Sequence, residues 1–156
     1  MRWRPAWPRV GDPDPVVIVD ANVLLYAVDS TAAHHENSRS WLDRSLAGSE
    51  AVGLAWVVLL AFVRIATSPA IHPTAMSVDD ALDQMETWLG APAAVVAQPS
   101  ARHVGVLGSL IRSVGTGGNL TTDAHLAALA IEHSAEIVSY DRDFARFTGV
   151  KHRIPG

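Results

Sequence analysis

Short, almost wholly apolar runs alternate along this chain with longer segments of helical periodicity. The clearest run is Val16-Val17-Ile18-Val19, which is followed at once by Asp20. A continuous β-branched run is typical of a strand buried on both faces of a parallel sheet. Shorter apolar runs at residues 52–55, 94–97 and 136–139 each follow a helical segment. This order predicts an α/β fold, with a mainly parallel sheet of about four to five strands between two layers of helices.

The helical segments are bounded by residues that favour helix starts and stops. Helices are expected at residues 22–28, 35–47, 56–67, 78–89, 100–114 and 121–133. Ser100 is expected to cap the fifth of these, because a serine side chain can accept a bond from a free backbone N–H. The density of apolar residues makes the third a largely buried helix, with Trp56, Phe62 and Ile65 expected in the core.

Length and composition fit one globular domain. The chain has 156 residues, of which 49% are apolar and 18% charged. We expect an extension at residues 1–15 and a single domain at residues 16–156. The absence of cysteine excludes disulfide scaffolds, thiolate zinc sites and thiol nucleophiles. It allows an intracellular location, and we expect the cytoplasm. Residues 51–62 are too short an apolar stretch to span a bilayer, so we expect no membrane association.

The net charge of −4 argues against a protein that binds nucleic acid through a uniformly basic surface. It does not exclude a nuclease, because carboxylates gathered around a metal ion contribute negative charge of their own. Local arginines can then still contact phosphate.

Aspartates stand at several places that a parallel sheet would bring to one edge. Asp20 follows the first strand directly, and Asp141 follows the fourth strand by two residues, with Asp143 just beyond it. Asp123 lies in the first turn of the helix before that strand. Carboxyl ends of parallel strands form the ligand-binding edge of such sheets. Carboxylates that meet there repel one another unless a cation lies among them.

The expected cation is Mg²⁺ or Mn²⁺, because aspartate supplies hard oxygen ligands and no thiolate is present. Such ions support hydrolysis of phosphodiesters by activating water and neutralising phosphate charge. Asn22 could hold a metal-bound water or orient Asp20, and Ser139 could do the same for Asp141. The residues thus indicate a metal-dependent nuclease.

The order and spacing of these segments resemble the PIN-domain ribonucleases, and more narrowly the VapC toxins of bacterial toxin–antitoxin pairs. The matching segments are Val19-Asp20-Ala21-Asn22-Val23-Leu24, His34-His35-Glu36 followed by Trp41-Leu42, Asn119-Leu120-Thr121-Thr122-Asp123-Ala124-His125-Leu126-Ala127, and Ser139-Tyr140-Asp141-Arg142-Asp143-Phe144 followed by Phe147. Together they span about residues 16–150. The resemblance implies a PIN-like three-layer α/β/α sandwich.

The resemblance further implies a Mg²⁺- or Mn²⁺-dependent endoribonuclease. Asp20, Asp123 and Asp141 would be its metal-binding acids, and Asp143 an auxiliary one. A VapB-like antitoxin would place an apolar helix on its surface and a basic side chain near the acids. A homodimer is the assembly expected from the family. Transfer RNA or ribosomal RNA would be a suitable substrate, because unstacked bases in loops can be read by a protein.

One position departs from the family pattern. Members commonly carry a glutamate three residues before an arginine on the helix after the second strand, and here that position is Ala61, before Arg64. The loss leaves the number of metal ions open. It also supports an alternative, a PIN-like binding module with impaired catalysis. Aspartyl phosphatases and phospho-acceptor receiver domains fit less well, because both need a suitably placed lysine and Lys151 is the only one.

Several of these residues also have a simpler structural interpretation. Asp20 could be a turn residue after a strand, and Asp123 could merely stabilise a helix start. Arg64 and Arg142 are either surface charges or contacts to RNA phosphate. The pair His34-His35 is a poor candidate for metal binding, because adjacent helical residues point in different directions.

Overall fold

The computed structural model describes residues 12–115 and 117–156, without the side chain of Asn119. Residues 1–11 of the expected extension lie outside this range. Five short strands form one sheet: β1 (Val17–Val19), β2 (Val52–Leu54), β3 (Ala94–Val96), β4 (Glu136–Val138) and β5 (Lys151–Arg153). Their order is β3-β2-β1-β4-β5, and every neighbouring pair is parallel. The predicted parallel sheet is confirmed.

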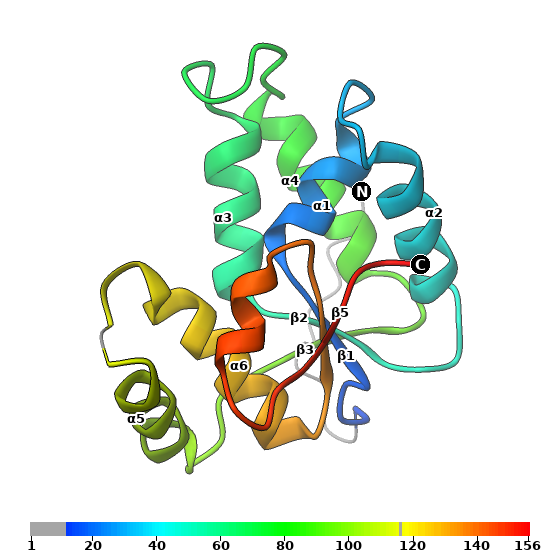
Figure 1. The fold of residues 1–156 in the computed structure, drawn as a ribbon. Coiled ribbons are helices and arrows are strands. Elements are labelled where there is room, and N and C mark those ends of the chain that lie inside the picture. The colour runs from blue at the N-terminus through cyan, green and yellow to red at the C-terminus, as the bar shows by residue number, and fades with distance from the viewer. Residues whose placement is uncertain (1–11, 116) are drawn as a thin grey trace.

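Helices cover both faces of this sheet (Figure 1). They are α1 (Ala21–Val28), α2 (His35–Leu46), α3 (Trp56–Ala66), α4 (Val78–Leu89), α5 (His103–Val114) and α6 (Thr121–His133), with short 3₁₀ turns η1 (Gly118–Leu120) and η2 (Arg142–Arg146). The connections through α1 to α4 step from β1 outward to β3. The connection through α5 and α6 returns across the sheet to β4. Right-handed crossovers therefore put α5 and α6 on the face opposite α1 to α4, as the three-layer prediction requires.

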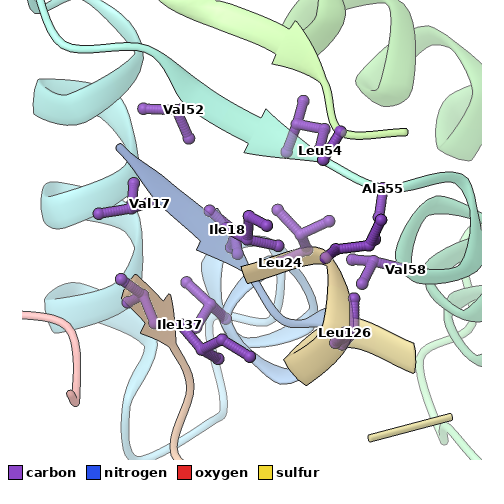
Figure 2. Packing of buried hydrophobic residues seen from close by; sticks show 14 of the residues in the cluster. Val17, Ile18, Leu24, Val52, Leu54, Ala55, Val58, Leu126 and Ile137 are labelled. Carbon is purple, nitrogen blue, oxygen red and sulfur yellow. The ribbon is translucent and has the colours of Figure 1, made fainter. Parts of the chain in front are cut away.

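The core lies where β1 and β2 meet the surrounding helices. Ile18 is fully buried, as are Leu24 of α1 and Leu126 of α6, and Figure 2 shows these side chains in one cluster with Leu54 of β2 and Val58 of α3. Both faces of β1 are covered, which explains its unbroken β-branched sequence. Among the described residues, no helix is long and apolar enough to cross a membrane.

Two local predictions were wrong. Ser100 does not cap α5, which begins at His103 with Arg102 as its N-terminal neighbour and no side-chain cap. The Ser100 hydroxyl accepts the Arg102 backbone N–H at 3.1 Å in the turn before the helix, and it donates to Glu132 of α6. Trp56 is not in the core but 45% exposed, because α3 buries a different stripe of its surface, at positions such as Phe62.

Candidate metal centre

The candidate site lies at the carboxyl ends of β1 and β4. These strands are neighbours, yet the chain proceeds from β1 toward β3 on one side and from β4 to β5 on the other. Ligands of open α/β sheets bind at such a point, because the two connections leave in opposite directions and open a crevice between them. Asp20 follows β1 at this edge, and Ser139 follows β4.

Three carboxylates come together here from segments that are distant in sequence. Asp123 lies in the first turn of α6, Asp141 precedes η2, and Asp143 lies within η2. One carboxylate oxygen of each residue lies within 4.8 Å of the other two. The Asp143 backbone N–H donates to Asp141 Oδ1 at 2.8 Å, so the turn itself keeps the last two acids close. Arg146 Nε lies 3.7 Å from Asp143 Oδ1 at the exposed side of the group.

Asp20 lies beside this group of three but is not a member of it. Its Oδ1 accepts the Ala21 backbone N–H at 2.7 Å. Its Oδ2 accepts bonds from Ser139 Oγ at 2.7 Å and from Asn22 Nδ2 at 3.3 Å. These bonds direct the carboxylate toward Ser139. A metal-binding role for Asp20 therefore stays a prediction.

Ser139 connects the two strand ends through its hydroxyl. The side chain is fully buried. While it donates to Asp20, its Oγ accepts bonds from Asn22 Nδ2 at 3.0 Å and from the Asp141 backbone N–H at 2.9 Å. Asn22 Oδ1 in turn accepts the Tyr140 backbone N–H at 3.2 Å. Asn22 and Ser139 thus have the contacts that an orienting role requires.

Two of the carboxyl groups at the site, those of Asp123 and Asp20, have a raised pKa. Burial, and then the charges of Asp141, Asp20 and Asp143, raise the pKa of Asp123 to about 6. Burial also raises the pKa of Asp20, although the bonds from Ser139 and Ala21 oppose it. Both shifts measure first the free energy of burying a carboxylate and then that of placing it beside other carboxylates. A divalent cation would relieve this repulsion, and an all-oxygen donor set suits Mg²⁺ or Mn²⁺. The residues present therefore fit such an ion.

No contact in the structure tests the roles of the remaining predicted residues. Arg142 is exposed within η2, between Asp141 and Asp143, and Arg64 is exposed in the last turn of α3. Ala61, in place of the family's glutamate, is half-buried on the same helix.

Sequence reasoning gave no role to His152 of β5. Its Nε2 lies 2.9 Å from the Ser139 carbonyl oxygen, and its charge lowers the pKa of Asp20. No sequence signal could have found it, because its segment Lys151-His152-Arg153 lacks the apolar residues that marked the other strands.

Known proteins are similar to this chain in sequence and in fold. A family model described as PIN domain matches residues 17–150. Two relatives come from Mycobacterium tuberculosis. Ribonuclease VapC37 is 55% identical to this chain over 86% of this chain and 93% of its own length. Ribonuclease VapC33 is 36% identical over 90% of this chain and 98% of its own length. The crystal structure of VapBC2 from Rickettsia felis, bound to a DNA fragment from its promoter, superposes with a TM-score of 0.61, at 16% identity over 88% of this chain and 97% of that one. The chain therefore belongs to the PIN domain family, in its VapC branch.

Proposed function

We propose that this protein is a metal-dependent endoribonuclease toxin that is neutralised by a VapB-like antitoxin. The observation that carries the proposal is the group of Asp123, Asp141 and Asp143, whose carboxylate oxygens lie within 4.8 Å of one another at the sheet edge. Membership of the VapC branch, whose relatives are named ribonucleases, supports RNA as the substrate.

The metal would be held by Asp123 and Asp141, with Asp143 at the exposed side and Asp20 beside them. When bound, Mg²⁺ or Mn²⁺ supplies activation of water and neutralises charge on the phosphate and on the leaving oxygen. The protein's own part is to prepare the donors. Asn22 and Ser139 fix the Asp20 carboxylate and the start of the segment that carries Asp141. Such fixed donors need no rearrangement when the ion enters.

RNA phosphates would be attracted to exposed arginines. Arg142 lies between two of the acids in sequence and is the first candidate, and Arg64 is the second. A substrate with exposed loops, such as transfer RNA or ribosomal RNA, would offer unstacked bases and an accessible backbone. A cytoplasmic location is part of the same proposal.

A helical antitoxin would need an apolar surface on this protein. α3 and α4 pack against each other and leave large apolar side chains exposed, namely Trp56, Leu60, Val78 and Leu82. Exposed apolar groups of this kind are common at protein–protein interfaces. Co-purification of a small protein that blocks cleavage would support the assignment. We further propose that residues 16–156 form one domain that assembles as a homodimer, which the mass from light scattering would test.

The proposal is tested by RNA cleavage with and without metal. Wild-type protein should cleave RNA in Mg²⁺ or Mn²⁺ and lose the activity in a chelator. Asp141→Asn should remove it, whereas Asp83→Asn, at an exposed position of α4, should not. Sequencing of RNA ends after expression of each variant identifies the substrate.

The alternative is a binding module whose catalysis was lost with the glutamate that Ala61 replaces. It is favoured by the absence of any acid on α3. Wild-type protein that binds its partner but cleaves no RNA in either metal ion would establish this alternative and contradict the enzyme.

A further inference from the structure

Three aromatic rings meet where α1, α2 and the segment after β4 come together. The His34 ring stacks on the Tyr140 ring, with centroids 4.2 Å apart and an interplanar angle of 18°. Tyr26 of α1 meets Tyr140 edge-on at 5.4 Å and is tilted against His34 at 5.5 Å. We call Tyr26, His34 and Tyr140 the aromatic cluster.

Hydrogen bonds fix the ring at the base of this cluster. The Tyr140 hydroxyl accepts a bond from Asn37 Nδ2 at 2.9 Å and lies 2.9 Å from Ser38 Oγ. His34 directly precedes α2, and its carbonyl accepts the Ser38 backbone N–H at 2.9 Å. Both stacked rings are therefore tied to the same turn of α2. A surface fixed in this way loses little conformational entropy when a ligand binds.

His34 is the exposed member of the aromatic cluster, while Tyr26 and Tyr140 are half-buried. Six of the seven histidines in the chain have a ring nitrogen at hydrogen-bonding distance from another protein atom, as His35 does with the Tyr26 carbonyl oxygen at 2.8 Å. Within residues 12–115 and 117–156, the His34 imidazole has ring contacts with Tyr26 and Tyr140 but no hydrogen bond. Packing of α1 against α2 alone does not require an exposed aromatic ring at this position.

The aromatic cluster is joined directly to the acidic residues. Tyr140 immediately precedes Asp141, and its backbone N–H donates to Asn22, the residue that also bonds Asp20. An RNA chain with a phosphodiester at the carboxylates would thus have an adjoining nucleotide close to the aromatic cluster. Proteins bind bases of single-stranded RNA by stacking them on aromatic rings, including histidine.

We propose that His34, supported from behind by Tyr140, stacks on an unpaired base near the phosphodiester that is cleaved. The inference rests on the proposed function and adds a subsite for a single-stranded nucleotide to it. Stacking on a ring is tolerant of base identity, because every base has a π face. The subsite therefore selects for unpaired RNA rather than for one sequence.

The test compares variants of His34 on one RNA oligonucleotide. The probe is a single-stranded RNA that spans the cut found by RNA-end sequencing, with 2-aminopurine replacing one base on either side of that cut. Wild-type protein and His34→Phe should quench the fluorescence of one of the two probes, whereas His34→Ala and His34→Leu should not. Loss of one stacking contact should weaken RNA binding by about 5- to 140-fold, the equivalent of about 1–3 kcal/mol.

A second substitution in the RNA separates stacking from a merely structural effect. An abasic nucleotide at the quenched position should weaken RNA binding by wild-type protein. It should weaken RNA binding no further when the protein carries His34→Leu. Full additivity of the two changes would overturn the inference. An equal loss of RNA binding in His34→Phe and His34→Ala would also overturn it, because that result would assign the ring to helix packing alone. Thermal melting of each variant reports on the fold.

The outcomes also distinguish this inference from the proposed function. Wild-type protein that neither binds nor cleaves the RNA contradicts the proposed function. Normal cleavage and quenching with His34→Ala contradicts the subsite alone. If His34→Ala loses antitoxin binding but cleaves and binds RNA as the wild type does, the aromatic cluster is a protein interface. That result also overturns the inference.

Discussion

The Ser139 hydroxyl has three bonding partners at the site, as many as the Asp20 carboxylate has. This buried hydroxyl contacts Asp20, Asn22 and the Asp141 N–H. We expect Ser139→Ala to lower the free energy of unfolding by about 1–3 kcal/mol, because it leaves buried donors and acceptors without a partner. Urea denaturation measures the loss. Ser113→Ala, which removes a hydroxyl from an exposed position of α5, should change stability by less than about 0.5 kcal/mol. Equal effects of the two changes would contradict the role assigned to Ser139.

Asp123 makes the stability of the metal-free protein depend on pH. Its pKa is about 6 in the folded protein, against an ordinary value of 3.8. The folded state therefore holds the proton more tightly than the unfolded state does. This contribution to stability is fully present below the ordinary pKa and is lost as the pH rises through about 6.

Removing that charge should therefore stabilise the metal-free protein. At pH 7 in a chelator, we expect Asp123→Asn to raise the free energy of unfolding on the order of 1 kcal/mol, a value reduced by solvent screening at this half-exposed group. Urea denaturation at pH 7 and pH 4 checks it, since the gain should shrink at the lower pH. Asp83→Asn serves as the control at an exposed position of α4. A destabilised Asp123→Asn at pH 7 would show that the carboxylate repulsion is not significant.

At the scale of elements, helices and central strands could be predicted closely, whereas the edge of the sheet and the polar contacts between helices could not. Apolar runs in the sequence indicated β1 to β4, because strands that are covered on both faces bury apolar side chains. β5 lies at the edge, paired only with β4, and its Lys151-His152-Arg153 sequence gives no such signal. Ser100 was wrongly assigned to a cap because its partner, Glu132, is distant in sequence.

Glu132 holds the start of α5 against α6. Its side chain has no solvent exposure, accepts bonds from the backbone N–H and hydroxyl of Ser100, and contacts His103 Nδ1. His103 Nε2 continues to His125 Nδ1 at 2.8 Å. Burial acts to raise the pKa of Glu132, but the bonds from Ser100 and His103 outweigh it and hold that pKa below its usual range.

Loss of this carboxylate should loosen the pair of helices. We expect Glu132→Ala to lower the free energy of unfolding by about 2–4 kcal/mol, because two donors from Ser100 and one from His103 lose their acceptor. Hydrogen exchange should show the loss of protection concentrated in α5. Glu86→Ala, at an exposed position of α4, should leave both measurements unchanged. Uniform loss of protection across the sheet would argue against a local link between α5 and α6.

At the scale of the whole molecule, the strand order determines where the acids meet. The sequence places Asp20 and Asp141 after strands, and the parallel sheet brings both to one edge because β1 and β4 are neighbours. Asp123 joins them from the helix layer that crosses to the other face. What the sequence could not predict is that Asp20 would bond Ser139 and lie outside the group of three, because that choice depends on side-chain geometry.

Metal binding should therefore stabilise the whole fold in a pH-dependent way. A ligand at 100 times its dissociation constant adds about 2.7 kcal/mol to the free energy of unfolding. We expect Mg²⁺ to raise the melting temperature more at pH 7 than at pH 5, because Asp123, with a pKa of about 6, must lose its proton to bind the ion. Asp141→Asn should abolish the shift, and Asp83→Asn should keep it. An equal shift at both pH values, or one that survives Asp141→Asn, would place the ion away from these carboxylates.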